Sequence, residues 1–429
     1  MALAPATPSD TALPADQATP IDAPGLQYFV FALFFIFGGI TSLNDVIIPK
    51  LKELFTLNYT QAMLVQFCFF AAYAIIGIPG AKLIKRIGYM RGAVFGLVTM
   101  MAGCMLFIPA SQTATYGLFL LALFILASGV VIVQVVANPL ISLLGPARTA
   151  HSRLTFAQAF NSLGTTVFPI VGSALILGGL AAINASQLSG AELDAYRQAE
   201  SEAIWQGYLG LAVLIGLVAA AVWTFRNRLQ GEKHEASRGL AGLDLLKRPR
   251  FGYGALCIFL YVGAEVAIGS ILINYLMQPH VLNVAEDVAG PMIALYWGGA
   301  MVGRFIGSAL LRMVSPGLIL GSVATGAIVL IALSANSTGQ VAAYALLAVG
   351  LMNSIMFPTI FSLACEKLGP RAADGSGIIN VAICGGAIVP LAFGALADMT
   401  GGNLSLALAL PVVCYTVIAG FGIYARRPA

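Results

Sequence analysis

The sequence predicts an all-α membrane protein with twelve transmembrane helices in two pseudo-symmetric six-helix halves. Three observations predict this fold: a scarcity of charge, a series of long apolar stretches, and an internal repeat. Hydrophobic residues make up 59% of the 429 positions and charged residues only 9%, whereas soluble domains are about 25% charged. A chain of this length cannot hide so much apolar surface in one water-bounded core. The composition therefore excludes a soluble enzyme, a disordered chain and a nucleic-acid-binding protein, despite the net charge of +4.

Twelve stretches are long and apolar enough to cross a bilayer, which takes about 20 residues of helix. They are continuous apolar runs without the alternation of a β-barrel. Helices are then the structures that satisfy every backbone polar group within lipid. The predicted spans are 27–49, 60–82, 90–110, 115–145, 153–180, 205–227, 252–278, 289–312, 317–335, 339–366, 375–398 and 404–425.

The basic residues predict the orientation, because Lys and Arg gather in cytoplasmic loops. Of the 22 basic residues, Lys50, Lys52 and Arg197 fall on one side and Arg304 lies inside a span, which leaves eighteen on the other side. Both termini of this multi-pass chain are therefore predicted to be cytoplasmic.

The chain is predicted to have a tail, two halves and a loop between them. The tail lacks the basic and apolar regions of a signal peptide, so we expect a disordered cytoplasmic segment. The longest charged stretch is predicted to be a cytoplasmic loop between the halves. The boundaries are 1–25 for the tail, 26–228 for the N-terminal half, 229–250 for the loop and 251–429 for the C-terminal half.

The two halves repeat one another at glycines, prolines and basic residues, with offsets close to half the chain. Parallel six-helix repeats are the arrangement of the major facilitator fold, which places the substrate site between the halves near the membrane midplane. We expect Gly80, Pro139, Pro358 and Pro390 to mark bends and close helix contacts with a structural or gating role. Simple tolerance of Gly and Pro in membrane helices is the alternative. The matching positions are Gly80 with Gly307, Gly164 with Gly385, Pro169 with Pro390, and Pro139 with Pro358.

Ionisable residues inside spans are candidates for function because their burial is costly. Asp45 lies in the first span, where a carboxylate can bind and release a proton. The alternative is that Asp45 pairs with Lys50 or Lys52 at the outer end of the span. Glu265 and Arg304 lie inside spans seven and eight. They are expected either to contact the ligand or to pair with each other or with backbone carbonyls.

Neutral amides and aromatic rings outnumber the charged groups in the spans. An amide donates and accepts hydrogen bonds at once, which suits the hydroxyls of a neutral sugar, although a buried amide can also simply join helices. No cysteine has a CxxC neighbour, so we expect no disulfide, no metal site and no cofactor. The substrate-binding candidates are Gln134, Asn138, Gln158, Asn161, Glu265, Asn274, Trp297, Asn353, Phe357 and Asn380.

Several motifs are similar to those of one transporter family. They are Leu43-Asn44-Asp45, Gln134-Val-Val-Ala-Asn138-Pro139, Gln158-Ala-Phe-Asn161, Tyr261-Val-Gly-Ala-Glu265 and Phe357-Pro358. From about residue 27 to the last span, the chain resembles the fucose–galactose–glucose–proton symporter family of the major facilitator superfamily. It resembles the bacterial glucose/galactose transporters of that family more than the fucose permease.

The resemblance implies proton-coupled uptake of a hexose across the bacterial inner membrane, with Asp45 as the proton-coupling carboxylate. It also implies that Gln158 and Asn161 line the central cavity. Asn44, beside Asp45 in the first span, is a further substrate-binding candidate. Gln134 stands where the fucose permease has a glutamate, which weakens transfer of a two-carboxylate mechanism and of fucose as substrate. Some members of the family are sodium-coupled, so the ion stays open, and Asn380 has no matched counterpart.

Other functions fit the same fold. The chain could be a sodium-coupled or facilitative sugar transporter, an exporter of drugs or neutral metabolites, or a sugar sensor. Scarce acidic residues argue against cationic drugs as substrates. No His or Cys is paired with acids in the way an intramembrane enzyme requires, so we expect no enzymatic activity. The expected partners are a neutral monosaccharide, a proton or sodium ion and the lipid bilayer; nucleic acid is not expected, and the chain is predicted to be a monomer.

Overall fold

A computed structural model describes residues 24–54, 59–113, 115–177, 190–227 and 241–426 of the chain. For several helical residues, including 43–54, 59–66 and 169–177, only the backbone is described. The described residues form helices and turns without any strand, as the composition predicts. Eleven segments among them are long and apolar enough to cross a membrane. The remaining predicted span, 153–180, lies on a helix whose last predicted residues are outside the described range.

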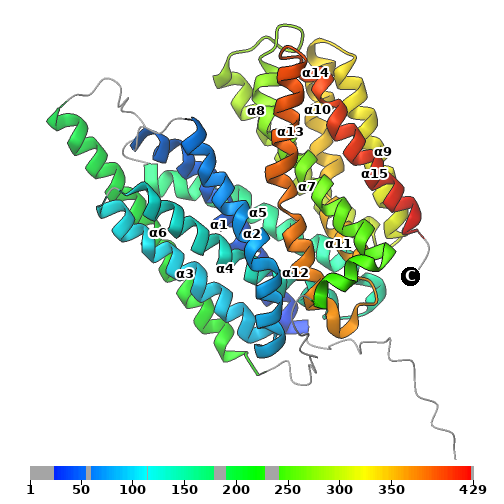
Figure 1. The fold of residues 1–429 in the computed structure, drawn as a ribbon, viewed down its shortest axis with the longest axis horizontal. Coiled ribbons are helices and arrows are strands. Elements are labelled where there is room, and N and C mark those ends of the chain that lie inside the picture. Colours follow the sequence, from blue (N-terminus) through cyan, green and yellow to red (C-terminus); the bar gives the residue numbers. More distant parts are fainter. Residues whose placement is uncertain (1–23, 55–58, 114, 178–189, 228–240, 427–429) are drawn as a thin grey trace, which may run out of the picture.

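Six long helices form the N-terminal half (Figure 1), and each corresponds to one predicted span, with ends that differ by several residues. None of them is interrupted, although α4 contains Pro139. The six are α1 (Pro24–Leu54), α2 (Tyr59–Ile87), α3 (Tyr89–Gln112), α4 (Tyr116–Leu143), α5 (Ala150–Leu177) and α6 (Ala191–Thr224), with a short 3₁₀ turn η1 (Ala147–Thr149) before α5.

The C-terminal half differs from the prediction because three of its predicted spans are divided. The span 339–366 is divided just before Pro358, and the span 375–398 is divided ahead of Pro390. A proline lacks the amide hydrogen that would bond the carbonyl four residues earlier, which explains the break before Pro358. Pro390 lies inside α13, six residues after the break at 383–384, so the missing amide hydrogen of Pro390 does not explain that break. The elements are η3 (Ala241–Lys247), α7 (Pro249–Leu276), α8 (Glu286–Leu310), α9 (Pro316–Ala335), α10 (Gly339–Asn353), α11 (Met356–Ala364), η4 (Gly369–Arg371), α12 (Ala372–Ala382), α13 (Gly385–Met399), α14 (Leu404–Ala407) and α15 (Ala409–Tyr424).

The internal repeat is visible as the same glycine contact in both halves. A Cβ atom on Gly164 of α5 would lie 2.1 Å from the carbonyl oxygen of Phe35 on α1. A Cβ atom on Gly385 of α13 would lie 2.0 Å from the carbonyl oxygen of Phe259 on α7. Only glycine permits backbones to approach this closely. The fifth and eleventh spans therefore cross the first and seventh in the same way, which confirms the two pseudo-symmetric halves.

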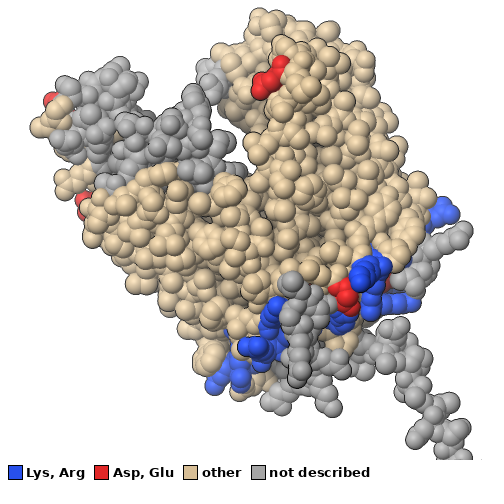
Figure 2. All heavy atoms as spheres, in the orientation of Figure 1, with Lys and Arg blue, Asp and Glu red and all other residues tan. Residues whose placement is uncertain are grey.

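The two halves meet at one end of the molecule and diverge towards the other (Figure 1). Lys and Arg side chains gather at the end where the halves meet (Figure 2), and we call this the basic end. Among the described residues on the face shown, the opposite end carries few charged side chains. All six cysteines are free thiols in the structure.

Candidate functional site

At the basic end, α2 of the N-terminal half crosses α12 of the C-terminal half. A Cβ atom on Gly77 would lie 2.7 Å from the carbonyl oxygen of Gly377, and one on Gly377 would lie 2.6 Å from that of Gly77. Two turns along α2, the Lys85 ammonium forms an ion pair with the Asp374 carboxylate of α12. Both side chains are buried, with 3% and 4% of their surface exposed. Glycine contact and ion pair together hold the two halves closed at this end.

An exposed ion pair extends this closure to the segment that joins the halves. The guanidinium of Arg371 in η4 donates to both carboxylate oxygens of Asp244 in η3, at 2.8 and 2.5 Å. The hydrogen bonds from Arg371 hold the pKa of the Asp244 carboxyl below its usual value. Arg371 also lies near Asp374, at 3.6 Å from Nε to Oδ2. The buried and exposed pairs therefore form one cluster at the basic end.

A second set of contacts joins α5 to the C-terminal half. Ser152 donates to the carbonyl oxygen of Ser308 at 2.6 Å and accepts from Nε of Arg312 at 3.1 Å. His151 Nδ1 and Ser362 Oγ lie 2.5 Å apart. Burial, with a smaller effect from nearby arginines, lowers the pKa of His151 to about 4, so its imidazole is neutral at physiological pH. These hydrogen bonds close the basic end on the α5 side.

We expect Gly77→Val to open the basic end, because the added side chain meets the Gly377 backbone and Val381 rather than a flexible group. Overpacking of this kind costs about 1–3 kcal/mol. Hydrogen–deuterium exchange should become faster in α2 and α12. The control is Gly80→Ala, whose Cβ atom would make only an ordinary contact, 3.5 Å from Ile132. Equal exchange in the two variants would show that the glycine crossing does not hold this end closed.

Arg304 of α8 lies between the two halves. Its Nε donates to the carbonyl oxygen of Ser354 at 3.1 Å. That oxygen is available because Pro358, four residues later, has no amide hydrogen. Across the interface, Nη1 donates to Ser162 Oγ and to the carbonyl oxygen of Gln158 at 3.5 Å, both on α5. Arg304 therefore pairs with backbone carbonyls, as one of the predicted alternatives stated, and also with a serine. Within the described part of the chain, no ion pair joins Arg304 to Glu265.

Asn353 is at the centre of a polar network inside the C-terminal half. Its amide nitrogen donates to Tyr296 at 2.8 Å, and its side-chain oxygen accepts from Tyr415 at 2.7 Å. Its backbone oxygen accepts from Tyr261 at 3.1 Å, while Tyr296 donates to the carbonyl oxygen of Glu265 at 3.3 Å. Asn353 is fully buried, and in this conformation its amide joins three helices. Its role in substrate binding stays a prediction.

Glu265 differs from its neighbours because one carboxylate oxygen is buried without a hydrogen-bond partner among the described atoms. An unpaired buried oxygen is costly. The carboxyl group therefore has free capacity to accept a hydrogen bond from another group. This keeps Glu265 among the ligand candidates.

The amides predicted on α4 and α5 lie in or beside the N-terminal core. Gln134 donates to Tyr73 of α2 at 3.0 Å, and Asn161 donates to the carbonyl oxygen of Phe34 at 3.4 Å. Asn138 is buried, and neither its amide nitrogen nor its oxygen has a partner within the described residues. Gln158 is also buried. Asn138 thus has unused hydrogen-bonding capacity in a buried position.

The other predicted residues are more scattered. Asn274 and Trp297 are exposed, and Phe357 is half-buried with its ring stacked on Phe361. Asn380 is buried and donates to the Ser376 carbonyl at 2.8 Å. Asn44 and Asp45 lie on α1, but their side chains are outside the described residues.

Sequence reasoning did not predict the contacts between α2 and α12 that join the halves. Lys85 was counted among cytoplasmic basic residues without a partner, and Asp374 and Gly77 were not singled out. Gly80, which was singled out, makes a looser contact than Gly77. The sequence shows a glycine at 77 and an acidic residue at 374, near the start of a predicted span. Neither feature identifies the residue that it contacts.

The whole architecture agrees with comparisons to known proteins. The family model described as Major Facilitator Superfamily matches residues 30–391. The chain belongs to the major facilitator superfamily. It is 48% identical over 395 residues to a glucose/galactose transporter of Brucella abortus biovar 1 (strain 9-941), covering 92% of each chain. It is 34% identical to an L-fucose-proton symporter of Escherichia coli (strain K12), covering 93% of this chain and 92% of the relative.

A solved structure shows the same fold. The transporter FucP in the outward conformation matches with a TM-score of 0.85 and 31% identity, covering 94% of this chain and 99% of that one. The resemblance inferred from the motifs is therefore confirmed, and this member of the superfamily is a multi-pass transporter rather than an enzyme.

Proposed function

We propose that this transporter carries a neutral hexose, of the glucose or galactose kind, into a bacterial cell together with a proton. The observation that carries the proposal is the set of amides on α4 and α5, which includes Asn138, whose two polar side-chain atoms are buried and have no partner among the described residues. Relatives with 48% and 34% identity are named as a glucose/galactose transporter and an L-fucose-proton symporter. An amide-rich, charge-poor core matches a ligand that carries hydroxyls and no charge.

The proton is assigned to Asp45. An acidic residue within a span is the expected carrier of a coupling ion, and Asp45 is the acidic residue in the first predicted span. Protonation of Asp45 and sugar binding would together favour one conformation. Coupling requires that the proton and sugar bind the two conformations with different affinities.

Alternating access is supported by the arrangement of the halves. They are held together at the basic end by the Lys85–Asp374 pair and diverge at the other end (Figure 1). With the basic end in the cytoplasm, both termini are cytoplasmic and this conformation opens outward from the inner membrane. Transport would then require separation of α2 from α12. We propose that a monomer performs this cycle.

Uptake into proteoliposomes tests the substrate and the ion together. Labelled galactose, glucose and fucose are supplied with a pH gradient alone or a sodium gradient alone. We expect galactose or glucose to accumulate when the outside is acidic, with sodium having no effect. Accumulation driven by sodium alone would replace the proton with sodium, and equilibration without accumulation would indicate a facilitative carrier.

Asp45→Asn is expected to abolish accumulation driven by a pH gradient, because an amide cannot take up the proton. Exchange of labelled for unlabelled sugar should persist, since it requires only sugar binding and the conformational change. Comparing the two assays on the same proteoliposomes separates lost coupling from misfolding. Retained accumulation in this variant would show that another group carries the ion.

Export of a neutral metabolite is the second candidate. The fold alone permits it, because a superfamily fold does not fix the direction or the substrate. Sugar-dependent protection against thermal unfolding, compared across a panel of neutral metabolites, distinguishes the two candidates.

A further inference from the structure

An open pocket lies at the end of the C-terminal half opposite the basic end, away from the α4–α5 amides. Three turns form it: the turn between α7 and α8, the turn between α9 and α10, and the turn between α13 and α14. Its volume is about 590 Å³, within the range of about 300–1,000 Å³ typical of small-molecule sites. The polar residues that line it are Gln278, His280, Asn336, Ser337, Thr338, Asn403 and Ser405.

The lining has the chemistry of a site for a neutral, hydroxylated ligand. It contains three side-chain amides and three hydroxyls, and it contains no Asp, Glu, Lys or Arg. A divalent cation such as calcium would call for carboxylates, and a phosphate would call for Arg or Lys. Amides and hydroxyls both donate and accept, so they can match the alternating donors and acceptors of a polyol.

The pocket is held in shape before any ligand arrives. His280 joins two of its walls, because its carbonyl oxygen accepts from Gly339 at 3.0 Å and its Nε2 lies 3.4 Å from Ser405 Oγ. Asn403 caps α14 by accepting from the Leu406 amide at 3.1 Å. A site whose walls are already fixed loses less entropy on binding.

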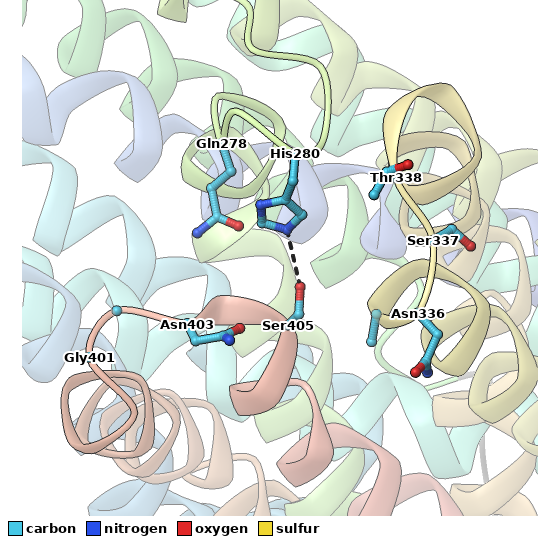
Figure 3. Close-up of a pocket in the computed structure, with 10 residues that line it drawn as sticks. Gln278, His280, Asn336, Ser337, Thr338, Gly401, Asn403 and Ser405 are labelled. Atoms are coloured by element: carbon cyan, nitrogen blue, oxygen red, sulfur yellow. Dashed lines mark hydrogen bonds between the residues drawn. The ribbon is translucent and has the colours of Figure 1, made fainter.

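One buried polar atom of this frame has no partner among the described residues. The side-chain oxygen of Gln278 is buried and has no hydrogen-bond partner among the described atoms. Figure 3 shows Gln278 and His280 extending from the α7–α8 turn towards Asn403 and Ser405. After a rotation of the Gln278 side chain that turns this oxygen to the pocket, a ligand hydroxyl that donates to it would satisfy it.

The third wall leaves room for a ligand. Gly401 and Gly402 have φ angles of 68° and 84°. A Cβ atom at either position would meet nothing within 4 Å. The positive φ angles favour glycine here, so at these two positions the wall presents backbone to the pocket, beside the side chains of Asn403 and Ser405.

We propose that this pocket is a second, outer binding site for a neutral polyhydroxylated molecule of monosaccharide size. The ligand class follows from the pocket's own side chains; its identity with the transported sugar rests on the proposed function. Such a site would hold substrate close to the outward opening. Its loss should raise the KM of uptake and leave kcat unchanged.

Protection from alkylation tests the site in the full-length protein. Ser337→Cys places a thiol in the pocket, and Ala285→Cys places one on the same end but outside the lining. A membrane-impermeant maleimide is applied with galactose or with sodium chloride of equal osmolarity, and the unsubstituted chain measures the reactivity of the native cysteines. At a galactose concentration about ten times the Kd, alkylation at 337 should slow about tenfold, since the free fraction falls as 1/(1 + [L]/Kd). Alkylation at 285 should not change.

Two further variants distinguish an outer site from a conformational effect. In a Gln158→Ala background, or in Gln134→Ala if that variant fails to fold, protection at 337 should persist because the outer site does not use the α5 or α4 amide. Gln278→Met should remove protection and raise the KM while leaving kcat unchanged. Loss of protection in the α4 or α5 variants, or no protection in any chain, overturns the proposal. Protection of a chain that does not transport galactose would keep the outer site and reject the proposed function.

Discussion

Asp374→Asn is expected to open the basic end and shift the protein away from the conformation described here. The Lys85 and Asp374 side chains are almost completely buried, with 3% and 4% exposed. Removing one partner of a buried pair costs about 3–5 kcal/mol, because the remaining charge stays in a poorly solvated place. That energy corresponds to a shift of about two to three and a half decades in the ratio of closed to open protein. Spin-label distances between the basic ends of α2 and α12 should lengthen, and gradient-driven uptake should fall.

Two controls make this result specific to the buried pair. The double charge reversal, Lys85→Asp with Asp374→Lys, should restore part of the closure because it keeps opposite charges in contact. Asp244→Asn removes the exposed pair with Arg371, which is screened by water and salt, so its effect should be small. If Asp374→Asn behaved like Asp244→Asn, the buried pair would not hold the basic end closed.

Arg304→Met is expected to weaken the contact between α8 and α5 and to reduce uptake strongly. The arginine donates to the Ser354 carbonyl, which has no helical partner because Pro358 lacks an amide hydrogen. The same arginine donates to Ser162 and Gln158 of the other half. Methionine preserves most of the packing but none of the donors, so it leaves buried acceptors unsatisfied at about 1–3 kcal/mol each. The closed state should therefore be less populated, which the same spin-label distances measure.

A double-mutant cycle with Ser162→Ala isolates the inter-half hydrogen bond. Hydrogen bonds to charged groups contribute about 1.5–3 kcal/mol, so the two substitutions should be non-additive by a similar amount in thermal unfolding. Arg304→Lys retains the positive charge but not the planar guanidinium group with its several donors. This variant should therefore recover only part of the stability that Arg304→Met loses. Strict additivity of the two single variants would show that Arg304 and Ser162 do not interact in the membrane.

The helices were predictable from the sequence because apolar length is a local property. Their ends were less so: α7 begins at Pro249, before the predicted residue 252. Counting apolar residues locates the part of a helix that lies in the hydrocarbon core of the bilayer, whereas the helix itself continues into the polar interface. The breaks near Pro358 and Pro390 were only partly predictable, since Pro139 leaves α4 intact. At Pro358 the break coincides with a partner for the freed carbonyl, Arg304, which lies 54 positions away in the sequence (358 − 304).

The site was predicted in its composition but not in its pairings. The amides on α4 and α5 were found from their spacing on one helical face, and Arg304 was expected to pair with carbonyls or with Glu265. The Lys85–Asp374 and Gly77–Gly377 contacts join positions about 290 and 300 residues apart, and no local rule reaches that far. Asn353 was expected to bind ligand, yet the tyrosines that surround it come from three other helices.

The glycine crossings at Gly164 and Gly385 have a kinetic consequence. Each places a helix directly on the backbone of its neighbour, with no side chain between them that could change rotamer. Helices within one half therefore cannot slide past each other by a change of side-chain rotamers at these crossings, so we expect each half to move as a rigid body. The slow motion of the molecule is then a change in the angle between the two rigid halves. After a rapid perturbation, this angle should relax with a single exponential.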